Sequence, residues 1–343
     1  MTLLLDPVKI IKINHNIEKH MTDIAFIDPT LQPRPEDFNF DLRKALSSII
    51  GVRVNVPENA FTAPSLGVER AGHGVMIEET GLILTIGYLT IEAQTIWLID
   101  GTGKAVPGHV LGYDQESGFG LIHALNPLNA GAIKIGSSSQ TEIGDTVLLA
   151  GAGGVKSTVK AAIAEKREFA GYWEYLLNEA IFTTPPHPFW GGAGLISKTG
   201  DLIGIGSLFV QQNHEDGSPF DGNMIVPIDL LSPILDDLLK FGRVNKSARP
   251  WLGTMVAEAP GTLVIAGLIP GGPGETAGLE PGDNVNAIEG KPTENLASFL
   301  RQLWSLGDAG IGVTLTIMRE QDLLDIKIKS ADRNAYLIQP NVH

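Results

Sequence analysis

A glycine-rich turn with the sequence FWGGAG, residues 189–194, is the stretch whose residue types come closest to a reactive centre. Acyl-transfer enzymes place a nucleophilic hydroxyl at a tight turn of this kind and aim adjacent backbone N–H groups at the oxyanion that develops. Two apolar runs, 195–196 and 202–205, flank a polar turn and predict a β-hairpin directly after it. The turn 189–194 contains no serine, threonine or cysteine. The sequence therefore predicts the frame of such a site without its nucleophile.

Other side chains that can do chemistry leave two alternatives open. Four histidines, His73, His109, His123 and His187, and the hydroxyl of Ser117 fall in the same part of the chain, so a relocated catalytic site is one alternative. A metal site that includes His73 and His187 is the other, although no close ligand spacing such as His-x-x-x-His supports it. We expect instead histidines without a catalytic role, because a triad needs matched hydrogen-bond geometry at three places. No metal and no cofactor are predicted.

The composition is that of a globular protein built mainly from short strands. The 343 residues are 43% hydrophobic and 19% charged, which suits a full core and two or three domains. Forty glycines and 21 prolines, spread along the chain, favour strands joined by turns. The net charge of −14 argues against nucleic acid or an anionic membrane as partner, because both attract clustered Lys and Arg. The absence of cysteine excludes disulfides, thiolate metal sites and a thiol nucleophile.

Neither a secretory leader nor a membrane span is predicted. Residues 1–20 contain an apolar patch broken by charged residues, without a basic start, a long apolar region and a cleavage site. The most apolar window, 81–99, contains Glu92 and does not reach the roughly 18 uncharged residues of a membrane helix. We therefore expect a cytoplasmic protein.

Turn signals and periodicity divide the chain into an arm, a strand-rich region and a second strand-rich unit. Residues 1 to about 40 are expected to be irregular, because Pro29, Pro33 and Pro35 prevent a continuous helix, and they form most of an arm over 1–45. A short helix over 40–48, capped by Asn39, is expected to follow. Short apolar runs then recur between turns, which predicts barrels or a sandwich because an antiparallel sheet must close or stack to hide its edges. A helix is expected over 228–241 with Gly242 as its C-cap, and it ends this region.

The second unit begins with the loop Trp251-Leu252-Gly253-Thr254. A strand, the segment PGGPGETAGLEPGDNVNAIEGKP and the helix LASFLRQLW follow in turn. In this order the unit resembles the PDZ domain of the HtrA (high-temperature-requirement) family of serine proteases. The resemblance implies that it binds an extended peptide or a protein C-terminus by strand addition, with the amides of the loop holding the carboxylate. A PDZ-like fold with a blocked groove is the alternative.

The region before it is similar, in the order and spacing of its elements, to the chymotrypsin-like double β-barrel of the same family. By this resemblance Tyr88, in TIGYLT, takes the position of the family's catalytic His, and Gly118, in DQESGFGL, that of the orienting Asp. Gly191, in FWGGAGL, takes the position of the nucleophilic Ser. A phenol with an ordinary pKa of about 10 is a poor base at neutral pH, and glycine can neither attack nor orient. Loss of a triad as a unit costs roughly 10⁶-fold in turnover.

We therefore predict a mainly β protein with an N-terminal arm (1–45), a degenerate trypsin-like double β-barrel (46–242), a linker (243–249) and a PDZ domain (250–333). The predicted function is that of a pseudoprotease, which binds peptides or unfolded protein segments through its PDZ domain in protein quality control. Such a protein could regulate or assemble with an active relative. The resemblance implies a homo-oligomer, specifically a trimer. An active serine endopeptidase with a rearranged site and a purely structural interaction module are the alternatives.

Overall fold

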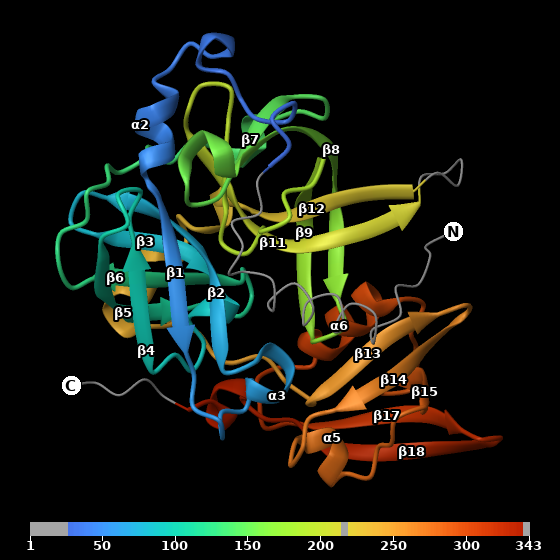
Figure 1. The fold of residues 1–343 in the computed structure, drawn as a ribbon. Helices are drawn as coiled ribbons and strands as arrows, with labels where there is room; N and C mark the ends of the chain where they lie inside the picture. The colour runs from blue at the N-terminus through green and yellow to red at the C-terminus, as the bar shows by residue number, and fades with distance from the viewer. Residues whose placement is uncertain (1–26, 214–218, 339–343) are drawn as a thin grey trace. The chain divides into compact units, whose positions relative to one another are not determined.

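The computed structural model describes residues 27–213 and 219–338 and consists of two compact units (Figure 1). The C-terminal unit comprises residues 168–178 and 246–337, and the barrel unit comprises the rest of the described chain. The C-terminal unit thus includes a short piece from the middle of the sequence. Most of the predicted arm, residues 1–26, lies outside the described residues.

The first half of the barrel unit is a closed barrel of six antiparallel strands in the order β1-β2-β3-β6-β5-β4. Alternation in β1 shows how the sequence directs burial: Val52 and Val54 are each 1% exposed, whereas Arg53 between them faces outward. Closure pairs every strand on both sides and leaves no edge. The strands are β1 (Ile49–Asn55), β2 (Glu69–Glu78), β3 (Leu82–Ile86), β4 (Thr95–Ile99), β5 (Ala105–Tyr113) and β6 (Phe119–Ala124).

The second half is another closed barrel, in the order β10-β11-β12-β9-β8-β7. Its core is formed by aliphatic residues such as Leu149, Leu195 and Ile225. Ile27 packs into the same core, so the described end of the predicted arm lies against this barrel. The strands are β7 (Thr146–Ala150), β8 (Thr158–Gly171), β9 (Tyr175–Thr184), β10 (Gly194–Ile196), β11 (Leu202–Asn213) and β12 (Pro219–Pro227).

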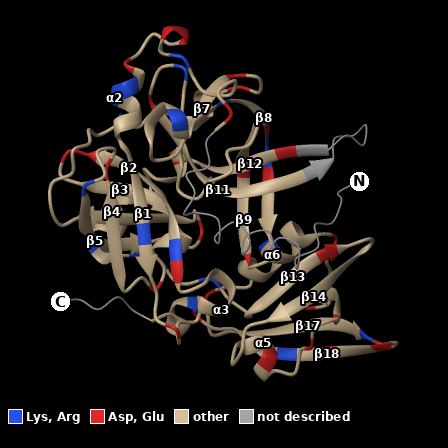
Figure 2. Cartoon of the chain, viewed as in Figure 1, with Lys and Arg blue, Asp and Glu red and all other residues tan. Residues whose placement is uncertain are grey.

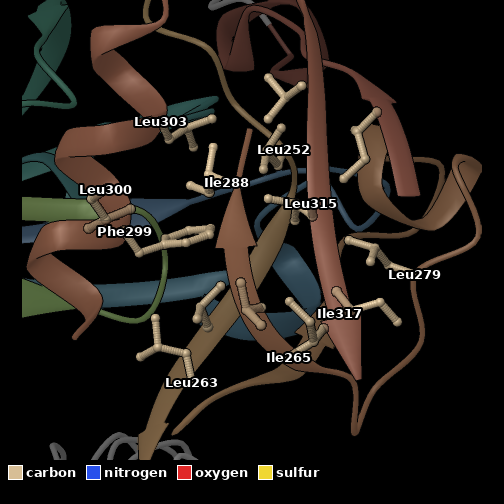
Figure 3. Close-up of a cluster of buried hydrophobic side chains, with 14 of the residues drawn as sticks. Leu252, Leu263, Ile265, Leu279, Ile288, Phe299, Leu300, Leu303, Leu315 and Ile317 are labelled. Carbon is tan, nitrogen blue, oxygen red and sulfur yellow. The ribbon is translucent and has the colours of Figure 1, made fainter. Parts of the chain in front are cut away.

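The C-terminal unit is built on a sheet in the order β13-β14-β15-β17-β18, with β16 paired to β15. Helix α6 (Leu296–Ser305) packs Phe299, Leu300 and Leu303 onto the sheet residues Ile265 and Leu315 (Figure 3). The strand β13 lies at the edge of this sheet, so its outer side has no strand partner within the sheet. The other elements are β13 (Thr254–Ala259), β14 (Thr262–Leu268), α5 (Pro273–Thr276), β15 (Asn284–Ile288), β16 (Lys291–Pro292), β17 (Gly312–Arg319) and β18 (Asp322–Lys329).

Two predicted helices differ from the structure at their N-terminal ends. The helix predicted over 228–241 begins at Leu235, as α4 (Leu235–Phe241), because Pro233 cannot donate an intrahelical hydrogen bond; a 3-10 turn precedes it. Its C-cap is Gly242, as predicted, with a φ of 70°. Helix α2 (Leu42–Ser47) is capped by Asp41, whose side chain accepts from the Lys44 N–H, and not by Asn39.

Basic residues are scattered along the chain in both units. Figure 2 shows Lys and Arg on separate elements, interspersed with Asp and Glu. Among the described residues, no helix combines the length and the apolar character needed to cross a membrane.

Candidate functional site

Tyr88, Gly118 and Gly191 lie together in the barrel unit. Tyr88 belongs to the 3-10 helix Gly87–Leu89, which directly follows β3. A Cβ at position 191 would lie 2.1 Å from the Tyr88 Oη, so the tyrosine fills the space that a side chain at Gly191 would need. The Gly87 N–H donates to the Gly118 oxygen at 2.6 Å, which holds Gly118 beside the same 3-10 helix. The structure therefore gathers the three predicted positions, and none of them has a carboxylate, an imidazole or an aliphatic hydroxyl.

A buried arginine fixes the backbone on which Tyr88 is placed. Arg70, only 3% exposed, donates from Nη1 to the backbone oxygens of Tyr88 at 2.9 Å and Ile91 at 3.0 Å. Its Nη2 donates to the Thr62 Oγ1 at 2.7 Å, and the Thr62 N–H in turn donates to the carboxylate of Glu92 at 2.8 Å. This chain of charged hydrogen bonds holds the 3-10 helix in one position.

The backbone amides of the turn 189–194 largely have partners within the protein. An oxyanion hole of the trypsin type uses the amide of the nucleophile position and the amide two residues before it, which here are those of Gly191 and Phe189. The Phe189 N–H donates to the His187 Nδ1 at 2.9 Å. The Gly192 N–H donates to the Gly206 oxygen at 2.9 Å, which also ties the turn to β11. One of the two amides of such a hole is therefore engaged by a histidine.

The Trp190 side chain is buried against strand β11. It is 8% exposed and lies against Phe209 of β11, with ring centroids 5.7 Å apart. A Cβ at position 206 would lie 2.2 Å from the Trp190 oxygen, so the backbone of β11 can approach only because residue 206 is glycine. Trp190 thus packs as part of the barrel.

His73 and His187 lie side by side, with ring centroids 6.2 Å apart. The Ala152 N–H donates to the His73 Nδ1 at 3.1 Å, and the His187 Nε2 faces the Ser157 oxygen at 3.0 Å. Since the Nδ1 atoms of both rings accept backbone N–H groups, the protons lie on Nε2. Burial lowers the pKa of His73 to about 3 and that of His187 to about 4, so both rings are neutral at pH 7.

This arrangement bears on the two alternatives that the sequence left open. A general base or a metal ligand needs a free nitrogen lone pair, and the lone pairs of His73 and His187 are already engaged. In the part of the chain that the structure describes, no group of three or more His, Asp or Glu side chains could hold a metal ion. Ser117 lies in a tight turn, where its N–H donates to Asp114 and its Oγ accepts from the Phe119 N–H. The Ser117 Oγ and the Nδ1 atoms of the two histidines therefore each accept a hydrogen bond from a backbone N–H group.

The predicted carboxylate-binding loop, Trp251 to Thr254, is found at the start of β13 and holds a carboxylate. Gly253 has a φ of 70°, which turns the amides of Leu252 and Thr254 toward one point. The Glu174 Oε1 accepts from the Leu252 N–H at 3.2 Å, from the Thr254 N–H at 3.1 Å and from the Thr254 hydroxyl at 3.3 Å. Glu174 is 6% exposed, and burial raises its pKa to about 7, although these hydrogen bonds and the charge of Arg333 oppose the rise.

Sequence reasoning did not identify Glu174. The segment Gly171-Tyr-Trp-Glu-Tyr falls within the predicted barrel domain, residues 46–242. The structure groups this segment with the C-terminal unit, and Trp173 stacks on Tyr175 with centroids 5.6 Å apart. The available signal was a single carboxylate within an aromatic turn, which does not indicate by itself which loop it contacts.

Two family models match the chain in separate regions. Residues 72–205 match a trypsin-like peptidase domain, and residues 250–330 match a PDZ domain. The match and the two closed barrels confirm the predicted fold class, a trypsin-like double β-barrel followed by a PDZ domain.

Similar proteins are serine proteases. Periplasmic serine endoprotease DegP of Salmonella typhimurium is 23% identical over 274 residues, which are 75% of this chain and 56% of DegP. Serine endoprotease DegS of the same species is 22% identical over 335 residues, 90% of this chain and 91% of DegS. A solved structure of a variant of the HtrA-type protease AlgW with a tripeptide is 19% identical, with a TM-score of 0.50 over 87% of this chain and 96% of that chain. This chain therefore spans about half the length of DegP and nearly all of DegS.

Proposed function

We propose that this protein, which has the trypsin-like peptidase and PDZ domains of HtrA-type serine proteases, is a non-catalytic relative of those enzymes. The observation that carries the proposal is that glycine stands at the position matched to the nucleophile while the Tyr88 hydroxyl fills the adjacent space. The use of the Phe189 amide by His187 supports it, because a developing oxyanion would have to displace that hydrogen bond.

Activity-based labelling tests the proposal. The purified protein is treated with a fluorophosphonate probe and separately incubated with casein, with purified DegP as the active control. We expect no covalent labelling and no casein fragments, because no activated hydroxyl is available at the matched position. Labelling that maps to one serine, and that a Ser→Ala change there abolishes, would instead establish an endopeptidase with a rearranged site.

The positive function that we propose is the binding of peptides or unfolded protein segments through the PDZ domain. The loop Trp251 to Thr254 supports it, since its two amides and one hydroxyl already converge on a carboxylate, the group that ends every protein chain. The edge strand β13 directly follows this loop and could pair with an extended peptide.

Fluorescence anisotropy with peptides of randomised C-terminal residues tests this binding. We expect free α-carboxylates to bind and the matching C-terminal amides not to bind. Gly253→Ala should weaken binding, because a φ of 70° is strained for alanine and the loop amides would turn away. Gly261→Ala is the matched control, with a φ of 75° in an open turn of the same unit. A library without binders to the wild type or to a Glu174→Ala variant would favour a purely structural module.

The wider biological role is part of the same proposal. We propose a homo-oligomer, a trimer by resemblance, that takes part in protein quality control and regulates or assembles with an active HtrA-type protease. Light-scattering mass measurement tests the oligomeric state, and co-purification with an active relative tests the assembly. The cytoplasmic location stays a prediction, which cell fractionation would test.

A further inference from the structure

The hairpin tip between β8 and β9 contacts both the edge strand β13 and the loop Trp251 to Thr254. The Val256 N–H of the edge strand β13 donates to the Tyr172 oxygen at 3.0 Å. Tyr172 and Glu174 both lie in the turn that joins β8 to β9, two residues apart. The tip therefore presents a backbone acceptor to β13 and, two residues later, a carboxylate to the loop amides. A strand added to β13 and ending in a terminal carboxylate would make contacts of the same kind.

Both legs of the hairpin are attached to the C-terminal unit. Arg301 of α6 forms an ion pair with Glu168 on β8, and its Nη2 donates to the Asn178 Oδ1 on β9 at 3.0 Å. Ala170 and Leu176 pack against the hydrophobic core of the unit. The tip is thus held at its carboxylate, at its backbone and at both legs.

Docking of Glu174 costs free energy in two ways, through the burial of a carboxylate and through the backbone conformation of the residue. A buried carboxylate loses its hydration, and here neutral amide and hydroxyl donors replace it. Glu174 also has a φ of 60°, a conformation that non-glycine residues rarely adopt. A strained residue with a buried acid, placed on a ligand-binding loop, is an arrangement that an incoming ligand can displace.

We propose that the tip of the β8–β9 hairpin, through Glu174, is an internal ligand that blocks the peptide site of the PDZ domain. The inference rests on the proposed peptide-binding function and adds its regulation. An incoming C-terminal carboxylate and Glu174 require the same two amides, so they exclude each other. Peptide binding therefore requires release of the hairpin, and the apparent affinity is reduced by the fraction of molecules in which it is docked.

The test compares the full-length wild type with Glu174→Ala and with Glu179→Ala. Glu179 is the matched control, because it lies on the same hairpin with its side chain 57% exposed and paired to Lys166. The probe is a fluorescein-labelled pool of short peptides with randomised C-terminal residues and free α-carboxylates. We expect Glu174→Ala to bind the pool about tenfold or more tightly than the wild type, as a site docked in roughly nine-tenths of molecules requires. Glu179→Ala should match the wild type.

Hydrogen exchange without peptide gives a second readout. The amides of Leu252 and Thr254 should exchange slowly in the wild type and faster in Glu174→Ala, and Arg301→Gln should accelerate them through a different contact. Equal peptide affinity of the wild type and Glu174→Ala would overturn the inference and leave the peptide-binding function standing. Failure of every variant to bind the pool would overturn the proposed function and the inference with it.

Discussion

A Gly191→Ala change tests whether Tyr88 occupies the place of the nucleophile. The added Cβ would lie 2.1 Å from the Tyr88 Oη and 3.2 Å from its Cζ. The hydroxyl would have to retreat by about 1.4 Å to reach an ordinary contact distance of about 3.5 Å. Overpacking of this kind costs about 1–3 kcal/mol. Because the clash involves the end of a half-buried side chain, we expect a loss of about 1–2 kcal/mol in the free energy of unfolding.

A Tyr88→Phe change should remove most of that loss. Without the hydroxyl, the nearest tyrosine atom is the Cζ at 3.2 Å, which needs to move by only a few tenths of an ångström. We expect Gly191→Ala to cost about 0.5 kcal/mol or less in the Tyr88→Phe background, which gives a coupling energy of about 1 kcal/mol. Chemical denaturation of the four proteins measures the cycle. A coupling near zero would refute the claim that the tyrosine fills the space beside Gly191.

Three further predictions follow from buried groups. Docking raises the pKa of Glu174 from about 4.5 to about 7, so the docked hairpin is most favoured below about pH 4.5 and weakens as pH rises toward about 7. The peptide affinity of the wild type should therefore rise between about pH 5 and pH 7 and level off above, whereas that of Glu174→Ala should stay constant over this range. Gly192→Ala should lower the free energy of unfolding by roughly 2 kcal/mol more than the control Gly144→Ala. Both glycines have a positive φ, but only a Cβ at position 192 would meet backbone, 1.8 Å from the His73 oxygen. Burial lowers the pKa of His187 to about 4, so part of the free energy of unfolding should be lost as pH falls from about 6.5 toward 4. When the free energy of unfolding is measured over this pH range, His187→Gln should lose less of it than the wild type.

Local sequence patterns predicted the succession of elements but not all of their ends. The alternation in β1 and the cap at Gly242 are encoded within a few residues, and the structure has both. Periodicity alone extended the last helix of the barrel unit back to residue 228, because apolar spacing does not register the missing N–H of Pro233. The N-cap of α2 is Asp41, whereas Asn39 was predicted. Both residue types can accept the capping hydrogen bond, so the sequence alone does not decide between them.

The sequence by itself determined the two domain types and the positions Tyr88, Gly118 and Gly191, because these depend on the order of motifs along the chain. By resemblance it also predicted that the loop Trp251 to Thr254 binds a carboxylate. Only the tertiary structure decided which groups fill these places: the Tyr88 hydroxyl beside Gly191, and the Glu174 carboxylate on the loop amides. Glu174 and Thr254 are 80 residues apart. Neither contact has a local pattern, since each is made between segments that the fold alone brings together.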